Sequence, residues 1–175
     1  MNIEVEIKVF ISEEKYFELL DFFRVHGEFL KEDYQETYYF DADVDLRIQR
    51  NDYFSKLVLK KGNIHDYQRE EYEVKFDRNE FEKLEKMFLA LGYKVAIKWF
   101  RKRHDFRWED IEVSVDFTRG YGYILELERK SDEINKELDL QILKDKLAKL
   151  DLELTPREEF DRCFNHYKEN WQKLV

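Results

Sequence analysis

Little in this sequence interrupts or cross-links the chain. It has one cysteine, one proline and five glycines, and no repeat or low-complexity tract. A single cysteine cannot form an intrachain disulfide, which excludes a small secreted scaffold held together by disulfides. With so few breaking residues and no linker, we expect a single domain over residues 1–175.

The sequence also lacks a long apolar run and an excess of basic residues. No segment approaches the ~18 apolar residues that cross a bilayer, and the N-terminal residues have no basic region. We therefore expect no membrane partner, no signal peptide and a cytoplasmic location. The net charge of −9 argues against a protein that coats nucleic acid, but not against a local basic pocket for an anionic small molecule. Aromatic residues make up 17% of the chain, which excludes a disordered chain.

Hydrophobic periodicity predicts eight strands and four helices. The predicted strands cover residues 2–10, 34–41, 44–50, 54–60, 67–76, 95–108, 111–117 and 122–129. The predicted helices cover residues 13–26, 79–91, 134–150 and 156–171. In the first of these helices, Phe17, Leu20 and Phe23 form the expected apolar face. Strands joined mostly by short turns indicate an antiparallel sheet and the α+β class, and eight strands are enough to close a barrel.

The polar face of most predicted strands carries charged side chains. These are Glu4, Glu6, Lys8, Arg47, Lys56, Lys60, Arg69, Glu71, Glu73, Lys75, Arg101, Arg103, Asp105, Arg107, Glu112, Asp116, Glu126 and Glu128. In one interpretation they form the solvated face of a half-buried sheet, held by ion pairs. In the other they point into a closed tunnel, which then needs a charged ligand because unpaired buried charges are costly. Periodicity alone leaves both interpretations open.

Two pairs of carboxylates are the most informative chemical signal. Glu4 with Glu6, and Glu126 with Glu128, are two residues apart on a strand and project to the same side. Such pairs can hold Mg²⁺ or Mn²⁺, and nearby Lys and Arg side chains would neutralise phosphate oxygens. A metal with cations is the equipment of phosphoryl or nucleotidyl transfer. The sequence has no P-loop, zinc-ligand spacing or nucleophile elbow that would compete with this interpretation.

A series of short motifs runs in order from residue 4 to residue 128. They are Glu4-Val5-Glu6-Ile7-Lys8, Leu46-Arg47-Ile48, Leu57-Val58-Leu59-Lys60, Arg69-Glu70-Glu71, Arg101-Lys102-Arg103, Val113-Ser114-Val115-Asp116 and Gly120-Tyr121-Gly122-Tyr123-Ile124-Leu125-Glu126-Leu127-Glu128. Together they resemble the signature of the CYTH family, also called triphosphate tunnel metalloenzymes, which includes class IV adenylyl cyclases and thiamine triphosphatases. The resemblance implies an eight-stranded antiparallel β-barrel, the triphosphate tunnel, with helices packed outside.

The resemblance also implies roles for individual residues. The implied metal ligands are Glu4, Glu6, Glu126, Glu128 and, directly or through water, Asp116. The implied triphosphate-binding residues are Lys8, Arg47, Lys60, Arg69, Arg101, Arg103 and, from the last helix, Arg157. Glu71 would line the tunnel in a supporting role. Gln49 stands where the family usually has a second arginine, and Lys56 is its possible substitute.

The resemblance leaves three functions open. We favour a triphosphatase, in which water attacks the terminal phosphorus of a small-molecule triphosphate and Lys8, Glu4 or Glu6 assists. The alternative is a class IV adenylyl cyclase that converts ATP to cyclic AMP and pyrophosphate. The third is a nucleotide- or polyphosphate-binding module without turnover, which the missing arginine at position 49 suggests. The physiological substrate, the metal preference and the oligomeric state do not follow from the sequence.

Overall fold

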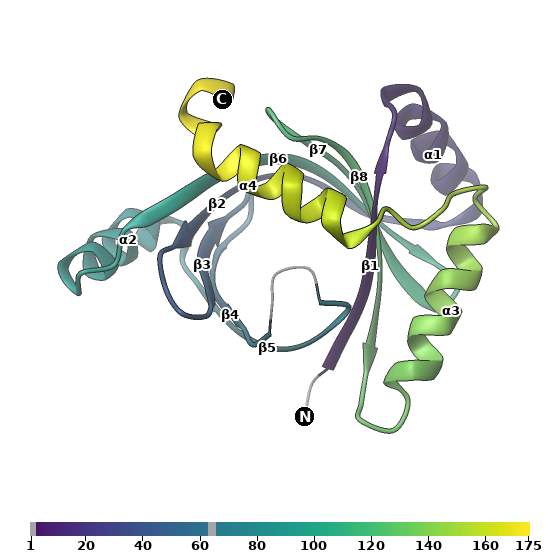
Figure 1. Cartoon of the computed structure of the whole chain (residues 1–175), viewed down its shortest axis with the longest axis horizontal. Coiled ribbons are helices and arrows are strands. Elements are labelled where there is room, and N and C mark those ends of the chain that lie inside the picture. Colours follow the sequence, from purple (N-terminus) through teal and green to yellow (C-terminus); the bar gives the residue numbers. More distant parts are fainter. Residues whose placement is uncertain (1–2, 63–65) are drawn as a thin grey trace.

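The computed structural model describes residues 3–62 and 66–175, and within these ranges eight strands form one closed antiparallel barrel. The order of neighbouring strands is β1-β5-β4-β3-β2-β6-β7-β8, and β8 pairs again with β1 (Figure 1). The strands are β1 Ile3–Ile11, β2 Glu28–Phe40, β3 Asp45–Arg50, β4 Ser55–Lys60, β5 Gln68–Phe76, β6 Val95–Trp108, β7 Ile111–Thr118 and β8 Gly122–Ser131. The helices are α1 Glu13–His26, α2 Phe81–Ala90, α3 Lys136–Ala148 and α4 Arg157–Leu174. The predicted α+β barrel with outer helices is confirmed.

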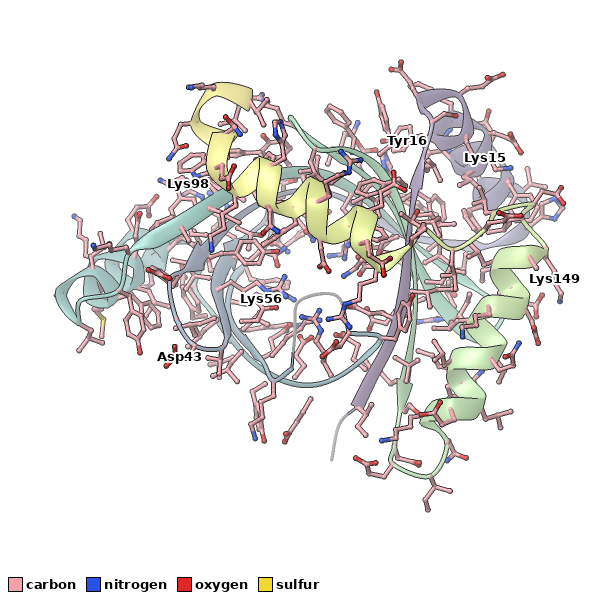
Figure 2. The ribbon with its side chains drawn as sticks, viewed as in Figure 1. Lys15, Tyr16, Asp43, Lys56, Lys98 and Lys149 are labelled. Carbon is pink, nitrogen blue, oxygen red and sulfur yellow. The ribbon has the colours of Figure 1, made fainter. Side chains whose placement is uncertain are left out.

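Each strand presents one face to the helices and the other to the inside of the ring. Lys56 on β4 points into the ring, whereas Lys149, at the end of α3, lies on the outside of the molecule (Figure 2). The apolar residues of β1, which are Ile3, Val5, Ile7 and Val9, are buried in the largest hydrophobic cluster of the described chain. The alternating polar residues of β1 must therefore point inward. The sequence left this direction open, and the structure decides it in favour of the tunnel.

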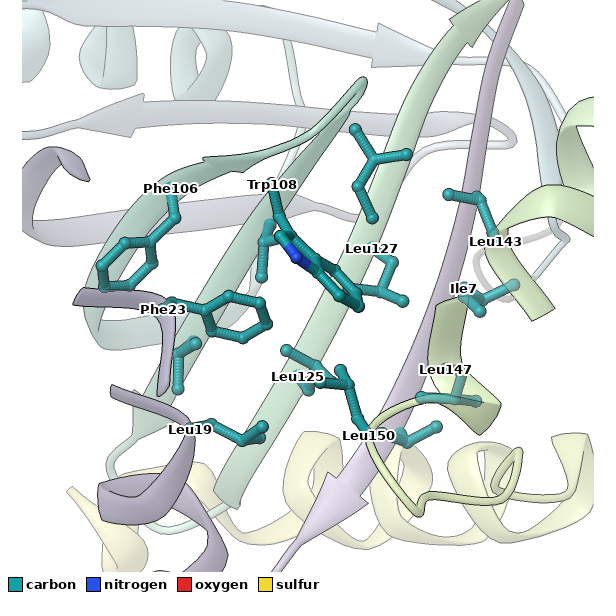
Figure 3. Packing of buried hydrophobic residues seen from close by; sticks show 14 of the residues in the cluster. Ile7, Leu19, Phe23, Phe106, Trp108, Leu125, Leu127, Leu143, Leu147 and Leu150 are labelled. Atoms are coloured by element: carbon teal, nitrogen blue, oxygen red, sulfur yellow. The ribbon is translucent and has the colours of Figure 1, made fainter. Parts of the chain in front are cut away.

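The largest hydrophobic cluster packs α1 and α3 against the outer faces of β1, β6, β7 and β8 (Figure 3). Phe23 of α1 lies against Phe106 and Trp108, with ring centroids 5.6 Å apart in both pairs. From the other side, Leu143 and Leu147 of α3 complete the cluster. Burying each such side chain contributes about 1.5–3 kcal/mol, so the outer contacts keep the strands closed around a charged interior.

The apolar face of α1 differs from the expected one, because it excludes Phe17 and includes Tyr16 and Leu19. Tyr16, Leu19, Leu20 and Phe23 are buried, whereas Phe17 is 56% exposed. At about 100° per residue, the four buried side chains centre near the direction of Tyr16 and Phe23, and Phe17 points about 110° away from it. Leu20 and Phe23 were placed correctly, and the expectation for Phe17 is wrong.

The second strand is longer than the sequence pattern indicates. The predicted strand 34–41 begins six residues too late, since β2 starts at Glu28. Residues 28–33 lack clean alternation, but they pair along the long strand β6, from Glu28 with Arg107 to Asp33 with Arg103. Tertiary pairing here outweighs local propensity. The extension matters because its residues reach the inside of the barrel.

The remaining helices cover the other side of the ring. Phe81 of α2 is fully buried against Tyr38 of β2, with ring centroids 5.0 Å apart. Tyr167 of α4 packs against Trp99 of β6 at 4.9 Å. Gly120 allows the β7–β8 turn to touch the end of α4: its φ is +71°, and a Cβ there would lie 2.6 Å from Leu174 Cβ. Among the described residues, no helix is both long and apolar enough to cross a membrane.

Candidate active site

Side chains from all eight strands line a cavity of about 540 Å³ inside the barrel. Among the residues that the structure describes, its wall contains eight cationic and eight acidic side chains. The cations are Lys8, Lys31, Arg47, Lys56, Lys60, Arg101, Arg103 and Lys130. The acids are Glu4, Glu6, Glu71, Glu73, Asp105, Glu112, Glu126 and Glu128. Charges of both signs at this density can bind a ligand that is itself highly charged.

Three of the predicted metal ligands meet on one part of this wall. Glu4, Glu6 and Glu128 each have a carboxylate oxygen within 4.8 Å of the others. The register of β1 and β8 causes this, because Glu6 is the direct partner of Glu128 and Glu4 projects from the same face. We call these three residues the carboxylate trio.

The protonation of the carboxylate trio reflects crowding of like charges. Burial and the negative charges of Glu4 and Glu126 raise the pKa of Glu128 well above its usual value. Burial also raises the pKa of Glu4, although Lys60 opposes this. For Glu6, Lys8, Lys60 and Arg69 outweigh the effect of burial and hold the pKa well below its usual value. A hard divalent cation prefers oxygen ligands and would relieve this crowding, so the donor set fits Mg²⁺ or Mn²⁺.

The other two predicted metal ligands, Asp116 and Glu126, lie in a different environment. Asp116 is 1% exposed and accepts hydrogen bonds from Arg101 at 3.2 Å and from Arg103 at 2.7 Å. Glu126 lies 3.1 Å from Arg103 and 3.6 Å from Lys8. Burial would raise the pKa of Glu126, but Arg103 and Lys8 lower it to about 2. The five predicted ligands thus divide into the trio, whose carboxylates lie close to one another, and the pair Asp116 and Glu126, which Arg103 contacts.

Most of the predicted phosphate-binding cations are already paired with carboxylates of the wall. Lys8 Nζ lies 3.0 Å from Glu6, and Lys60 Nζ contacts both Glu4 and, at 2.6 Å, Glu71. Glu6 and Glu4 raise the pKa of Lys60 in spite of its burial, so Lys60 is charged. Without a ligand, these cations are therefore neutralised by carboxylates of the wall. A polyanion that binds the cations must displace those carboxylates.

Arg47 and Arg69 are joined by a buried aspartate that sequence reasoning missed. Asp45 accepts hydrogen bonds from Arg47 at 2.7 Å and from Arg69 at 2.8 Å. Arg69 also donates to Glu6 at 2.7 Å, is 3% exposed and is not part of the cavity wall. Arg69 thus lies behind the cavity wall, where its hydrogen bond orients Glu6. Asp45 could have been found, because it lies two residues before Arg47 on the same face of the strand.

Two further predicted residues lie on the wall, and one does not. Lys56 lines the cavity directly opposite Gln49 in the β3–β4 register, so it can supply the cation that position 49 lacks. Glu71 lines it beside Lys60. Arg157 is outside the wall: it is 47% exposed, and its Nη1 lies 2.9 Å from Asp66. The structure thus separates Arg157 from the other predicted phosphate ligands.

The structure adds residues to the wall from the ends of two strands. Lys31 and Gln35 come from β2, and Gln35 accepts a hydrogen bond from Arg101 at 2.7 Å. Lys130 and Ser131 come from the end of β8, beyond the predicted limit of residue 129. Lys130 continues the alternation of Glu126 and Glu128, so a strand limit two residues later would have included it.

The sequence and the fold are both similar to those of known proteins. The profile of the CYTH domain matches residues 2–157. A Methanocaldococcus jannaschii protein with the provisional name adenylate cyclase is 35% identical over 146 residues, which cover 77% of this chain and 81% of that protein. The structure of a conserved hypothetical protein from Pyrococcus furiosus is similar, with a TM-score of 0.73 and 27% identity over 88% of this chain and 96% of that one. A Hippeastrum protein, described as an adenylyl cyclase candidate with a dominant triphosphatase activity, shares the fold at 19% identity, with a TM-score of 0.67 over 95% and 96% of the two chains.

Proposed function

The chain belongs to the CYTH domain family, and from this premise we propose that it is a metal-dependent hydrolase that removes the terminal phosphoryl group of a triphosphate. One observation carries the proposal: a crowded carboxylate trio and at least five cations share one cavity of about 540 Å³. Carboxylates suit a divalent metal and cations suit a polyanion, so the cavity offers separate partners to both.

Glu4, Glu6 and Glu128 are the residues that would hold Mg²⁺ or Mn²⁺. When bound, such an ion neutralises charge on phosphoryl oxygens and makes nearby water more acidic. Glu6 is prepared for this role because Arg69 orients its carboxylate with a 2.7 Å hydrogen bond. Neighbouring cations also keep Glu6 ionised.

Lys8, Arg47, Lys60, Arg101 and Arg103 would bind the phosphate groups. The two arginines of β6 project from the same face of that strand, and both reach Asp116. An arginine can donate two parallel hydrogen bonds to a phosphate, and such charge-assisted bonds are stronger than those between neutral groups. These cations would neutralise the charge that spreads over the transferring phosphoryl group, which is the main requirement of this chemistry.

Hydrolysis forms one phosphorus–oxygen bond and breaks another. The oxygen of a water molecule attacks the terminal phosphorus, the bond to the bridging oxygen breaks, and orthophosphate and the shortened phosphate ester or diphosphate leave. The water loses a proton, which a carboxylate of the wall or the leaving phosphate accepts. Lys8 lies between Glu6 and Glu126 and can donate a hydrogen bond to the phosphoryl oxygen as its charge increases.

An adenylyl cyclase is the second candidate, because the Methanocaldococcus jannaschii relative bears that provisional name. In that reaction the ribose 3′-oxygen attacks the α-phosphorus of ATP and pyrophosphate leaves. Within the described residues, the cavity wall is charged or polar except for Ile3 and Val58. Such a wall suits a chain of phosphates better than a flat base, which normally stacks on aromatic or apolar side chains. We therefore place hydrolysis first.

Product analysis separates the candidate functions. The purified full-length protein is incubated with Mg²⁺ or Mn²⁺ and tripolyphosphate, thiamine triphosphate or ATP. Orthophosphate as the product supports the hydrolase, whereas cyclic AMP with pyrophosphate identifies the cyclase. Tight binding of a triphosphate without either product would refute both reactions and identify a binding module. Glu4→Gln serves as the control that removes one metal ligand and keeps the side-chain shape.

A further inference from the structure

Lys130 differs from the other seven cations of the cavity wall. Lys8, Lys31, Arg47, Lys56, Lys60, Arg101 and Arg103 each lie within 4.0 Å of a carboxylate oxygen. Across residues 3–62 and 66–175, Lys130 forms no such pair, although it lines the same cavity and is exposed. A phosphate that binds Lys130 therefore breaks no existing ion pair, whereas one that binds Lys60 must compete with Glu4 and Glu71.

Lys130 lies at one end of the row of charged side chains that β1 and β8 contribute to the cavity wall. In the β1–β8 register, Lys8 is opposite Glu126, Glu6 is opposite Glu128, and Glu4 is opposite Lys130. Along this wall the carboxylate trio thus has Lys8 on one side and Lys130 on the other. Lys8 and Glu4 are four residues apart on β1, which corresponds to about 13 Å along the strand.

Three of the five cations assigned to the triphosphate, Lys8, Arg101 and Arg103, lie on the Lys8 side of the trio, whereas Lys60 contacts Glu4. Arg103 reaches Glu126, the carboxylate that Lys8 also contacts, and Arg101 joins it at Asp116. A phosphate chain that starts at Arg101 and Arg103 passes Lys8 and the trio before it reaches Lys130. We propose that Lys130 binds a fourth phosphate, so that the cavity selects linear polyphosphates of four or more phosphates over tripolyphosphate. This inference rests on the proposed function, since it assumes that a phosphate chain occupies the cavity.

The test compares tripolyphosphate with tetrapolyphosphate on the full-length protein in Mg²⁺. For each substrate kcat/KM is measured in the wild type and in Lys130→Gln, Lys130→Arg and Lys149→Gln. Lys149 is the matched control, because it is an exposed lysine on the far side of α3 (Figure 2). We expect Lys130→Gln to lower the tetra-to-tripolyphosphate ratio about fivefold, as one solvent-accessible charged contact implies. Lys130→Arg should restore the ratio, and Lys149→Gln should match the wild type.

Binding measured apart from turnover separates failure of this inference from failure of the proposed reaction. Titration calorimetry of the metal-free protein with the same two polyphosphates gives their affinity ratio. If no polyphosphate is hydrolysed but Lys130→Gln still lowers the affinity ratio, the subsite stands and the reaction is wrong. If both are hydrolysed and all four proteins share one ratio, the reaction stands and Lys130 is no phosphate ligand. The same conclusion follows if Lys149→Gln changes the ratio as much as Lys130→Gln.

Discussion

Arg69 donates a hydrogen bond of 2.7 Å to Glu6, although Arg69 itself does not line the cavity. The same guanidinium donates to Asp45 at 2.8 Å, and Asp45 in turn holds Arg47 at 2.7 Å. These contacts connect β1, β5 and β3, and three of the four side chains, Glu6, Arg69 and Asp45, are buried. They link Glu6, a candidate metal ligand, to Arg47, a candidate phosphate ligand. Arg69 and Asp45 therefore help to position both.

Replacing Arg69 by Met should therefore damage both the fold and the site. The change leaves Glu6 and Asp45 without a buried cationic partner, and breaking a buried pair in this way costs about 3–5 kcal/mol. We expect the free energy of unfolding in urea to fall by this amount and the affinity for Mn²⁺ to fall with it. Arg107→Met is the control, because Arg107 pairs with Glu28 on the exposed surface. A surface pair of this kind contributes at most about 1 kcal/mol, and an equal loss in both variants would contradict the role of Arg69.

Replacing Glu128 or Glu126 by Gln should change the free energy of unfolding in opposite directions. Removing the charge of Glu128 relieves its repulsion with Glu4 and Glu126, so Glu128→Gln should stabilise the metal-free protein at pH 7 while abolishing metal-dependent turnover. Removing the charge of Glu126 deprives Arg103 and Lys8 of a partner, so Glu126→Gln should destabilise it by about 2 kcal/mol. Urea unfolding of the metal-free proteins measures both changes. Destabilisation by both variants would contradict the prediction that Glu128 is repelled by its neighbours while Glu126 is attracted to its own.

The sequence could not predict that the pKa values of Glu128 and Glu126 are shifted in opposite directions. Alternation along one strand placed Glu4, Glu6 and Lys8 on a single face, because side-chain direction within a strand is a local property. Which carboxylates meet an arginine depends on register between strands, such as Arg103 opposite Asp116. One sequence carries no direct signal of register, so Glu126 was expected to act like Glu4, Glu6 and Glu128, whereas in the structure it contacts Arg103 and lies outside the trio.

Other differences have equally specific causes. Lys31 escaped notice because the first part of β2 has no regular alternation and depends on its pairing with β6. Lys130 was missed because the strand was ended too early. The family resemblance implied a phosphate-binding residue on the last helix, for which Arg157 was the candidate. Its side chain contacts Asp66, because the direction of a side chain at a helix start depends on its tertiary partners. Local patterns thus gave the elements, and contacts between elements decided the site.

Acid should remove the stabilisation that Asp45 provides. Burial would raise the pKa of Asp45, but Arg47 and Arg69 outweigh burial and lower it. A carboxyl whose pKa is lowered in the folded state contributes its full stabilisation above its unfolded pKa of about 3.9, and loses it as the pH falls through the folded value. We expect Asp45→Asn to be less stable than the wild type at pH 6, with a gap that narrows from about pH 5 downward. Urea unfolding across this range tests the prediction, and a gap that widens in acid would refute it.

Metal and triphosphate should each strengthen the binding of the other. Lys60 contacts both Glu4 and Glu71, so a metal that binds Glu4 removes one of the two partners of Lys60, and a phosphate that binds Lys60 frees Glu4. Each ligand thus removes part of the cost of binding the other, and the coupling must be the same from both sides. Calorimetry with Mn²⁺ and imidotriphosphate, which resists hydrolysis, should show at least a tenfold mutual gain, equivalent to about 1.4 kcal/mol.

The matched lysines of β4 can distinguish this coupling from the complex that Mn²⁺ and imidotriphosphate form in solution. Lys60→Gln removes the exchange with Glu4 and should reduce the mutual gain. Lys56→Gln also removes one cation from the cavity wall, but Lys56 pairs with Glu73, outside the carboxylate trio, so the gain should persist there. Formation of the complex in solution is identical for all three proteins and cannot produce a difference between them. Equal gains in Lys60→Gln and the wild type would mean that exchange of ion pairs in the wall does not couple the two ligands.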